Sequence, residues 1–265
     1  TQTTPEFPTG FEKLDKAIWG YNRGELHIVC GKPNAGKSLF MAIGTLTNAK
    51  NGSRPLIFST ETSANKLINR CLIHEYGIES VHFRNGQFTQ AEIDLLRNRA
   101  LPEFSKLPLI ICDNMSLSIE DIEKTVKKYS PDMIFVDYFQ RCKFGNDSHF
   151  CATEFAKRLK NIARDHNIPV IVGTQVNARK SWSKEKGTWV DCDVSSGDVR
   201  TTQGLWHEAD ISIILNTRRN PDSQQMGVKL QIDKARDADY ITLYFKFDKN
   251  VLRYYPITRE EYYAI

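Results

Sequence analysis

A short apolar run that leads directly into a glycine-rich octapeptide constrains the fold of this chain most strongly. The run covers residues 26–30, and residues 31–38 read G-K-P-N-A-G-K-S, which fits the pattern G-x-x-x-x-G-K-[ST]. The pattern predicts a phosphate-binding loop between a buried strand and a helix, where backbone N–H groups and the helix dipole converge on phosphate oxygens. We therefore expect an α/β fold that binds a nucleoside triphosphate.

Each part of the loop has a predicted role. We expect Lys37 to reach the β- and γ-phosphates and Ser38 to ligate Mg²⁺. The other nucleotide contacts are expected from Gly31, Asn34, Ala35, Gly36 and Leu39. A chance match in a surface loop is the alternative, but the strand pattern before it and the helix pattern after it favour a phosphate-binding loop.

Length and composition allow one large α/β domain, because the chain has 265 residues and 40% of them are hydrophobic. Neither an apolar stretch of about 18 residues nor a signal sequence is evident, so we expect a cytoplasmic protein without a membrane span. The six cysteines form no C-x-x-C pair, which favours reduced thiols over a metal site or disulfides. The net charge of +4 is too small to indicate a nucleic-acid partner by itself.

Strand-like runs recur along the chain, and several are continuously apolar, as expected for strands buried on both faces of a parallel sheet. They cover residues 25–30, 55–59, 107–112, 133–136, 169–173, 211–215, 228–233 and 241–247. Helical patterns lie between the earlier runs, at residues 37–50, 63–76, 89–100, 118–128 and 152–166, and capping-box sequences begin at Thr89 and Ser118. This alternation predicts right-handed βαβ units, and the strand-rich end predicts an antiparallel extension at one edge.

Two carboxylates and an amide are predicted to complete the nucleotide site. Asp137 ends an apolar run, as the Mg²⁺-supporting Walker B aspartate does. Glu61 and Gln175 follow two further runs, so all three should lie at the carboxyl edge of the sheet, where ligands bind in open α/β folds. We expect Glu61 to activate the attacking water and Gln175 to hydrogen-bond the γ-phosphate or its water. From the residues alone, two alternatives remain open. Glu61 would then be a solvated residue at a helix cap, and Gln175 a strand-end residue whose side-chain amide bonds the backbone.

Two cations close the strand-like run 228–233. Lys234 and Arg236 are separated by one residue, so both side chains point to the same side of an extended segment. Two neighbouring cations repel each other unless an anion is present, so we expect a phosphate partner. That phosphate could belong to the nucleotide of the same subunit or, for an arginine finger, to that of a neighbour.

A long stretch without periodicity covers residues 176–204 and contains several lysines, arginines and tryptophans. Long loops inside compact domains are usually functional, and a solvated insertion is the alternative.

The ordered motifs together resemble the motor domain of the DnaB-type replicative DNA helicases, which are ring-forming relatives of RecA. Residues 8–15 are similar to the entry of that domain, 58–63 to the motif whose glutamate is catalytic, 136–140 to its D-Y-L-Q Walker B, 175–179 to its Q-L-N-R and 234–236 to its K-x-R finger. Residues 198–204, running on to 208–210, resemble its DNA-loop segment. The resemblance covers residues 8–250 and departs from the family pattern at Thr201 and Gln203.

The resemblance implies a RecA-like P-loop NTPase, with a mostly parallel twisted sheet, flanking helices and an antiparallel C-terminal extension. It implies an ATP- and Mg²⁺-dependent helicase that moves 5′ to 3′ on single-stranded DNA as a homo-hexamer, in a bacterium or a phage-infected cell, with a primase or helicase loader as further partners. Lys234 and Arg236 would then reach across the subunit interface. DNA phosphates would be held in the central channel by loop residues, namely Arg179, Arg200, Thr201, Gln203 and Gly204.

We expect one ATPase domain over residues 1–265, with residues 1–9 as the end of a linker and 176–204 as the DNA-binding loop region. The chain is expected to be the motor without the amino-terminal collar of the family. Two other functions remain as alternatives: a RecA-like recombinase that forms open filaments, and a clock-like regulatory ATPase without unwinding activity. The D-V-R segment at 198–200 and the K-x-R pair favour the helicase.

Overall fold

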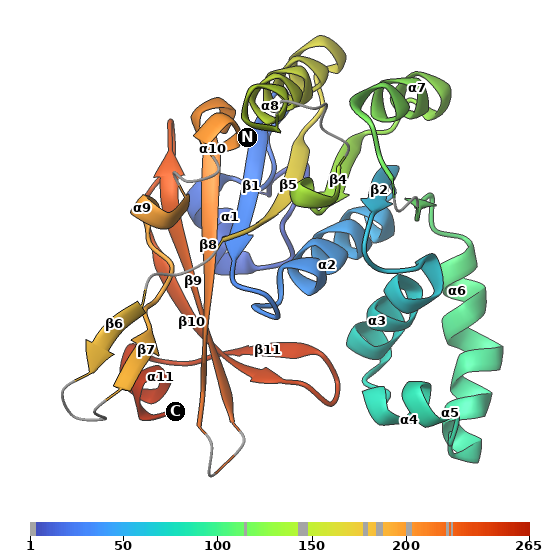
Figure 1. The fold of residues 1–265 in the computed structure, drawn as a ribbon. Helices are drawn as coiled ribbons and strands as arrows, with labels where there is room; N and C mark the ends of the chain where they lie inside the picture. Colours follow the sequence, from blue (N-terminus) through green and yellow to red (C-terminus); the bar gives the residue numbers. More distant parts are fainter. Residues whose placement is uncertain are drawn as a thin grey trace.

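The centre of the molecule is a nine-stranded sheet with helices on both faces (Figure 1). The computed structural model describes residues 4–113, 116–142, 148–176, 180–183, 188–199, 203–220, 223 and 225–265. Across the sheet the strands follow the order β11 (Arg253–Pro256), β10 (Thr242–Asp248), β9 (Met226–Ala235), β8 (Ile211–Arg219), β1 (Leu26–Gly31), β5 (Val170–Gln175), β4 (Met133–Asp137), β2 (Pro55–Ser59) and β3 (Ile110–Cys112).

The six strands from β8 to β3 are mutually parallel, whereas β8, β9, β10 and β11 pair antiparallel. The predicted fold class is therefore confirmed, including the antiparallel extension at one edge. Among the described residues, no helix is long and apolar enough to span a membrane.

Each face of the sheet is covered by its own set of helices. One apolar cluster joins strand residues such as Val29 and Ile171 to α1 (Glu12–Ile18), α2 (Lys37–Lys50) and α3 (Ala64–Tyr76). The other joins their neighbours Ile28 and Val170 to α7 (Ile119–Tyr129), α8 (Ser148–His166) and α10 (Gln203–Glu208). Because successive side chains of a strand point to opposite faces, burial on both faces requires the continuous apolar runs seen in the sequence.

Further short elements complete the fold. They are α4 (Ser80–Asn85), α5 (Gln90–Leu95), a π-helical turn (Leu96–Ala100), α6 (Leu101–Ser105), a 3-10 turn (Phe139–Arg141), β6 (Lys180–Ser183), β7 (Thr188–Asp191), α9 (Ser196–Val199) and α11 (Arg259–Ala264). The prediction of a helix over 89–100 is too short, since helical backbone continues to Ser105. Proline usually ends a helix, but Pro102 stands in the first turn of α6, directly after the π-helical turn.

Two other predicted segments differ in the structure. The run 107–112 forms a strand only from Ile110, because the N–H of Leu107 bonds the Phe104 carbonyl at the end of α6. The stretch 176–204 is not without regular structure, since it contains the antiparallel hairpin β6–β7 and the short helix α9. In that hairpin Trp182 stands opposite Trp189, and a single cross-strand pair of this kind leaves no long periodic pattern in a sequence.

Free thiols are present at Cys30, Cys71, Cys112, Cys142 and Cys192. Cys30 and Cys71 are buried, and burial raises the pKa of each to about 12. These two thiols are therefore protonated at neutral pH and behave as small apolar core residues.

Both predicted capping boxes are present, and the one that opens α7 can be tested. The Ser118 hydroxyl accepts the Asp121 N–H at 3.1 Å, and the Asp121 carboxylate accepts the Ser118 N–H at 3.0 Å. Ser118→Ala should therefore lower the free energy of unfolding by about 1 kcal/mol in urea denaturation. Thr125→Ala is the control, because that hydroxyl only donates to the Asp121 carbonyl within the same helix. An equal loss in both variants would contradict the capping role of Ser118.

Candidate active site

A cavity of about 390 Å³ opens at the carboxyl ends of the parallel strands. It is lined by nine of the residues predicted to bind or act on the nucleotide: Asn34, Ala35, Gly36, Lys37, Ser38, Leu39, Glu61, Asp137 and Gln175. They come from the loop after β1, from the end of β2, and from β4 and β5. Residues far apart in the sequence are thus brought together at one edge of the sheet, where ligands bind in folds of this class.

The loop between β1 and α2 has the backbone of a phosphate-binding loop. Asn34 and Gly36 both have positive φ, at 61° and 93°. The Lys37 ammonium donates to the carbonyl oxygens of Gly31 at 3.0 Å and Lys32 at 2.8 Å, which folds the lysine over the loop. Burial lowers the pKa of Lys37, although the negative charges of Asp137 and Glu61 oppose that shift. A buried ammonium at the start of a helix is a favourable site for phosphate oxygens.

Asp137 fits a metal-supporting role. Its side chain is 2% exposed, and its Oδ1 atom has no hydrogen-bond partner in the described part of the chain. Burial raises the pKa of Asp137, while a hydrogen bond from Ser38 and the positive charges of Arg70 and Lys37 lower it. A buried carboxylate oxygen that lacks a protein partner, beside a serine hydroxyl, suits a hard cation such as Mg²⁺.

Glu61 reaches the cavity because β2 pairs with β4. Ser59 stands opposite Asp137, and the Thr60 N–H and hydroxyl donate to the Asp137 carbonyl at 2.8 and 3.0 Å. These bonds fix the chain immediately before Glu61, whose side chain is exposed and lines the cavity. The arrangement places a second, accessible carboxylate beside the buried one.

Gln175 is held next to the phosphate-binding loop by its backbone. It pairs with Gly31 in the sheet. The side-chain amide of Gln140 bonds both backbone groups of Gln175. Its oxygen accepts the Gln175 N–H at 3.0 Å, and its nitrogen donates to the Gln175 carbonyl at 2.8 Å. Gln175 lines the nucleotide cavity.

The cation pair lies elsewhere. Lys234 stands opposite Ser212 of β8, which itself is level with Ile28 of β1, so the pair lies towards the amino ends of the parallel strands. Gly31 lies five residue steps beyond Leu26 along β1, a span of roughly 17 Å. Arg236 lines a different cavity, near Asp210 and Trp19. The structure therefore does not bring Lys234 or Arg236 to the nucleotide cavity of their own chain.

The residues predicted to contact DNA are only partly described. Arg179, Arg200 and Thr201 lie outside the described residues, as does the side chain of Gln203. Gly204 lies in α10 against α8, where an added Cβ would stand 2.5 Å from the Thr153 Cα atom. Close helix packing thus accounts for this glycine, and its contact with DNA stays a prediction.

Several residues without a predicted role also line the nucleotide cavity. Lys66 and Arg70 stand one helical turn apart on α3, and their cationic side chains face the same cavity as Glu61. Phe247 and Leu252, from the hairpin of β10 and β11, form an apolar side of it. The i, i+4 spacing of the two cations after Glu61 was visible in the sequence, whereas the approach of the hairpin depends on the order of strands in the sheet.

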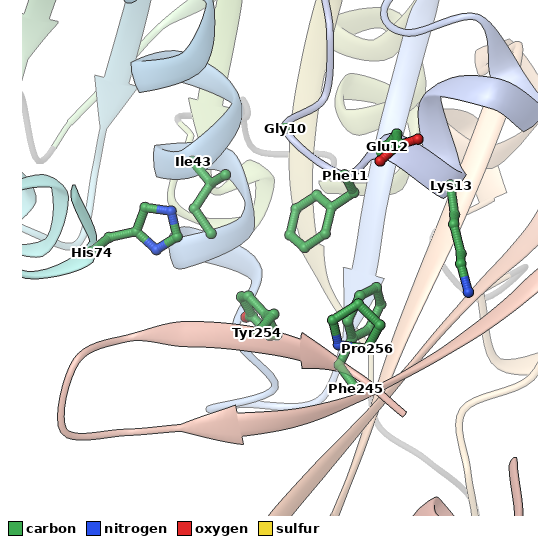
Figure 2. A pocket seen from close by; sticks show the side chains of 9 residues that line it. All are labelled: Gly10, Phe11, Glu12, Lys13, Ile43, His74, Phe245, Tyr254 and Pro256. Carbon is green, nitrogen blue, oxygen red and sulfur yellow. The ribbon is translucent and has the colours of Figure 1, made fainter. Parts of the chain in front are cut away.

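Another cavity, of about 220 Å³, lies between α2 and the β10–β11 hairpin (Figure 2). Its nine lining residues come from the amino-terminal segment, α2, α3 and the β10–β11 hairpin. Tyr254 lines this cavity and also packs on the loop, since a Cβ on Gly36 would lie 2.6 Å from the Tyr254 hydroxyl. The β10–β11 hairpin therefore supports the loop from behind.

This contact predicts the effect of Gly36→Ala. Both the left-handed backbone and the Tyr254 hydroxyl oppose a side chain there, so affinity for a fluorescent ATP analogue should fall at least about ten-fold. Gly52→Ala is the matched control, because Gly52 has a similar φ of 88° with no atom within 4 Å of an added Cβ. Both variants should lose about 1–2 kcal/mol of stability from backbone strain. Unchanged nucleotide affinity in Gly36→Ala would contradict the role of the loop.

Known proteins resemble the chain over most of its length. The family described as "DnaB-like helicase C terminal domain" matches residues 6–256. The "Replicative DNA helicase DnaB" of Synechocystis sp. is 33% identical over 184 residues, which make up 66% of this chain and 21% of that protein. The protein of the same name from Geobacillus stearothermophilus is 27% identical over 266 residues, or 95% of this chain and 57% of that protein. Almost all of this chain thus aligns with the Geobacillus stearothermophilus protein, of which it spans about half the length.

Two solved structures share the fold. One is a separately solved ATPase domain, which matches with a TM-score of 0.80 at 22% identity and covers 95% of this chain and 91% of its own. The other is a DnaB-like replicative helicase, solved in a study of its interactions with primase. It matches with a TM-score of 0.81 at 21% identity, covering 96% of this chain and 64% of that one. The RecA-like architecture predicted from the sequence is therefore present.

Proposed function

We propose, since this chain belongs to the family of DnaB-like helicase C-terminal domains, that it is the ATP-driven motor of a replicative DNA helicase in the cytoplasm. The observation that carries the proposal is the convergence of Lys37, Asp137 and Glu61, which come from three different elements, on one cavity. A buried cation, a buried carboxylate and an exposed carboxylate at a phosphate-binding loop are the groups that hydrolysis of a triphosphate requires.

Each group has a distinct role in the proposed reaction. The loop N–H groups and Lys37 bind the β- and γ-phosphates, and Ser38 and Asp137 hold Mg²⁺. When bound, Mg²⁺ neutralises the negative charge that the phosphates share. Glu61 accepts a proton from the attacking water, a role that suits an exposed carboxylate at the edge of the cavity. Gln175, fixed by Gln140, orients that water or the γ-phosphate.

The apolar side of the cavity suits the nucleobase. Phe247 and Leu252 line it, and an aromatic ring and an aliphatic side chain give a purine a flat contact without specific hydrogen bonds. Lys66 and Arg70 add positive charge near the phosphates. Removing them should weaken the binding of the triphosphate more than that of the nucleoside.

Lys234 and Arg236 are proposed to act on the nucleotide of a neighbouring subunit. They lie at the amino edge of the sheet, and more than half of the Arg236 side chain, 56%, is exposed to solvent. A finger that serves a neighbour's phosphate must face outwards at a subunit interface, and such an arginine stabilises charge in the transition state. The site is then complete only in an assembly, for which the family resemblance indicates a homo-hexameric ring.

Single-stranded DNA is the proposed track of the motor, held by phosphate contacts from the segment 198–204 and Arg179. A grip on phosphates without base readout suits a motor that must pass any sequence. One structural relative, the DnaB-like replicative helicase, is known to interact with primase. By analogy, a primase or a helicase loader is the proposed protein partner here.

Glu61→Gln and Lys37→Ala separate catalysis from binding. We expect Glu61→Gln to lower ATP hydrolysis by roughly 10²-fold or more and to leave ATP affinity almost unchanged, because it removes only the general base. Lys37→Ala should reduce both. Steady-state ATPase rates and binding of a fluorescent ATP analogue measure the two effects, with exposed Glu79, outside the cavity, changed to Gln as the control. Equal losses of affinity in both variants would remove the catalytic role of Glu61.

Arg200→Ala tests the proposed DNA contact. Losing one phosphate contact should weaken binding to oligo-dT and oligo-dA alike and flatten the slope of log affinity against log salt by about 0.7. Fluorescence anisotropy across a salt series, with an ATP analogue present, measures both quantities. Arg97→Ala, on the exposed helix that follows Thr89, controls for the loss of one positive charge. An unchanged affinity and slope would exclude Arg200 from the DNA grip.

A further inference from the structure

Lys234 and Arg236 are each held by residues at the end of α10 or directly after it. The Lys234 ammonium donates to the carbonyl oxygens of Trp206 at 2.9 Å and His207 at 3.0 Å, and it lies 4.7 Å from the centre of the Trp206 ring. The last carbonyls of a helix lack hydrogen-bond partners within the helix, and the helix dipole is negative at this end. A lysine ammonium therefore supplies both the missing donors and a favourable positive charge. Lys234 is thus fixed to the last turn of α10.

Arg236 is held by the residue that follows the same turn. Its Nη1 atom lies 3.4 Å from the Oδ1 atom of Asp210, whose side chain is only 7% exposed. The other carboxylate oxygen of Asp210 accepts the Leu26 N–H at 2.8 Å and the Lys160 ammonium at 2.5 Å. The Asp210 N–H in turn donates to the Leu26 carbonyl at 2.8 Å.

This anchoring differs from an ordinary surface ion pair. An exposed pair gains little because both long side chains lose conformational freedom, but Asp210 is already fixed by the backbone of β1. Only Arg236 is left to be ordered, and its planar fork can bond one carboxylate oxygen while other N–H groups point outwards. Asp210 therefore defines where the exposed guanidinium stands.

We infer that Asp210 is a positioning residue for Arg236, which it holds in the orientation needed to meet the γ-phosphate of a neighbouring subunit. The inference rests on the proposed role of Arg236 in trans. Fixing a catalytic group in advance lowers the barrier because less order has to be created at the moment of reaction. Asp210 thereby acts, through Arg236, on the active site of the neighbouring subunit.

Asp210→Asn tests the inference, because the amide keeps an oxygen for the Leu26 N–H but loses the charge that holds Arg236. We expect kcat for ATP to fall roughly ten-fold or more, with KM within about two-fold of the original value, since the binding groups of the cavity are untouched. Lys160→Gln is the matched control. It breaks the other ion pair of the same carboxylate but keeps Asp210 and Arg236, so kcat should stay within about two-fold.

Mixed rings distinguish positioning from damage to the fold. Asp210→Asn has an intact phosphate-binding loop, and Lys37→Ala has an intact finger, so mixing the two proteins should restore ATPase activity at mixed interfaces. Native mass spectrometry with a non-hydrolysable ATP analogue verifies the mixing. Arg236→Ala mixed with Lys37→Ala is the reference: if this mixture recovers no activity, the trans role of Arg236 fails and the inference fails with it.

If the reference recovers activity, three results would each overturn the inference alone: an unchanged kcat in Asp210→Asn, no recovery of that variant on mixing, or an equal loss of kcat in Lys160→Gln.

Asp210→Asn leaves Lys160 as an unpaired cation and could fail to fold. The double variant Asp210→Asn/Lys160→Gln replaces the ion pair by two amides, so no buried charge is unpaired. It should show the same loss of kcat and the same recovery, and a normal kcat in it would equally overturn the inference.

Discussion

The parallel pairing of β1 with β5 on one side and β8 on the other fixes the position of the phosphate-binding loop, around which the nucleotide cavity is built. Gly31, at the end of β1, is level with both Gln175 and Leu215, so the phosphate-binding loop emerges between these two strand ends. The same sheet brings Asp137 opposite Ser59 and therefore sets Glu61 beside it. Burial of the strands on both faces keeps this register, because a shift by one residue would exchange the two apolar faces.

The sheet also separates the chemistry into two edges. In the proposed reaction, phosphate, metal and water are bound at the carboxyl edge, whereas Arg236 and Asp210 lie at the amino edge beside Leu26. We propose that the pocket of one chain is completed by Arg236 of the next. Hydrolysis would then depend on contact between subunits, and the subunits of a motor could act in order. α10 connects the predicted DNA-binding segment with Lys234. The helix begins at Gln203, within that segment, and the carbonyl oxygens that accept from Lys234 lie in its last turn.

The sequence predicts the parallel core because a strand buried on both faces must be continuously apolar and ends where polar groups begin, as Asp137 and Gln175 show. It does not predict where Lys234 and Arg236 lie, because that depends on the antiparallel return of β9 beside β8. Arg70 follows the motif that contains Glu61, but the sequence assigns it no role, because its charge matters only through proximity to Asp137, which the fold creates. The short strand β11 has no pattern of its own, yet its Tyr254 supports the loop at Gly36.

The central claim is that the site is completed by a second copy of the chain. Electron microscopy of the protein with an ATP analogue, Mg²⁺ and oligo-dT tests this claim most directly, because it shows which groups surround the γ-phosphate. The account predicts a closed ring in which each triphosphate lies between Lys37 of one subunit and Arg236 of the next, with Asp210 still bonded to that arginine. A triphosphate surrounded by the groups of one chain alone, or an open filament with Arg236 facing solvent, would contradict it.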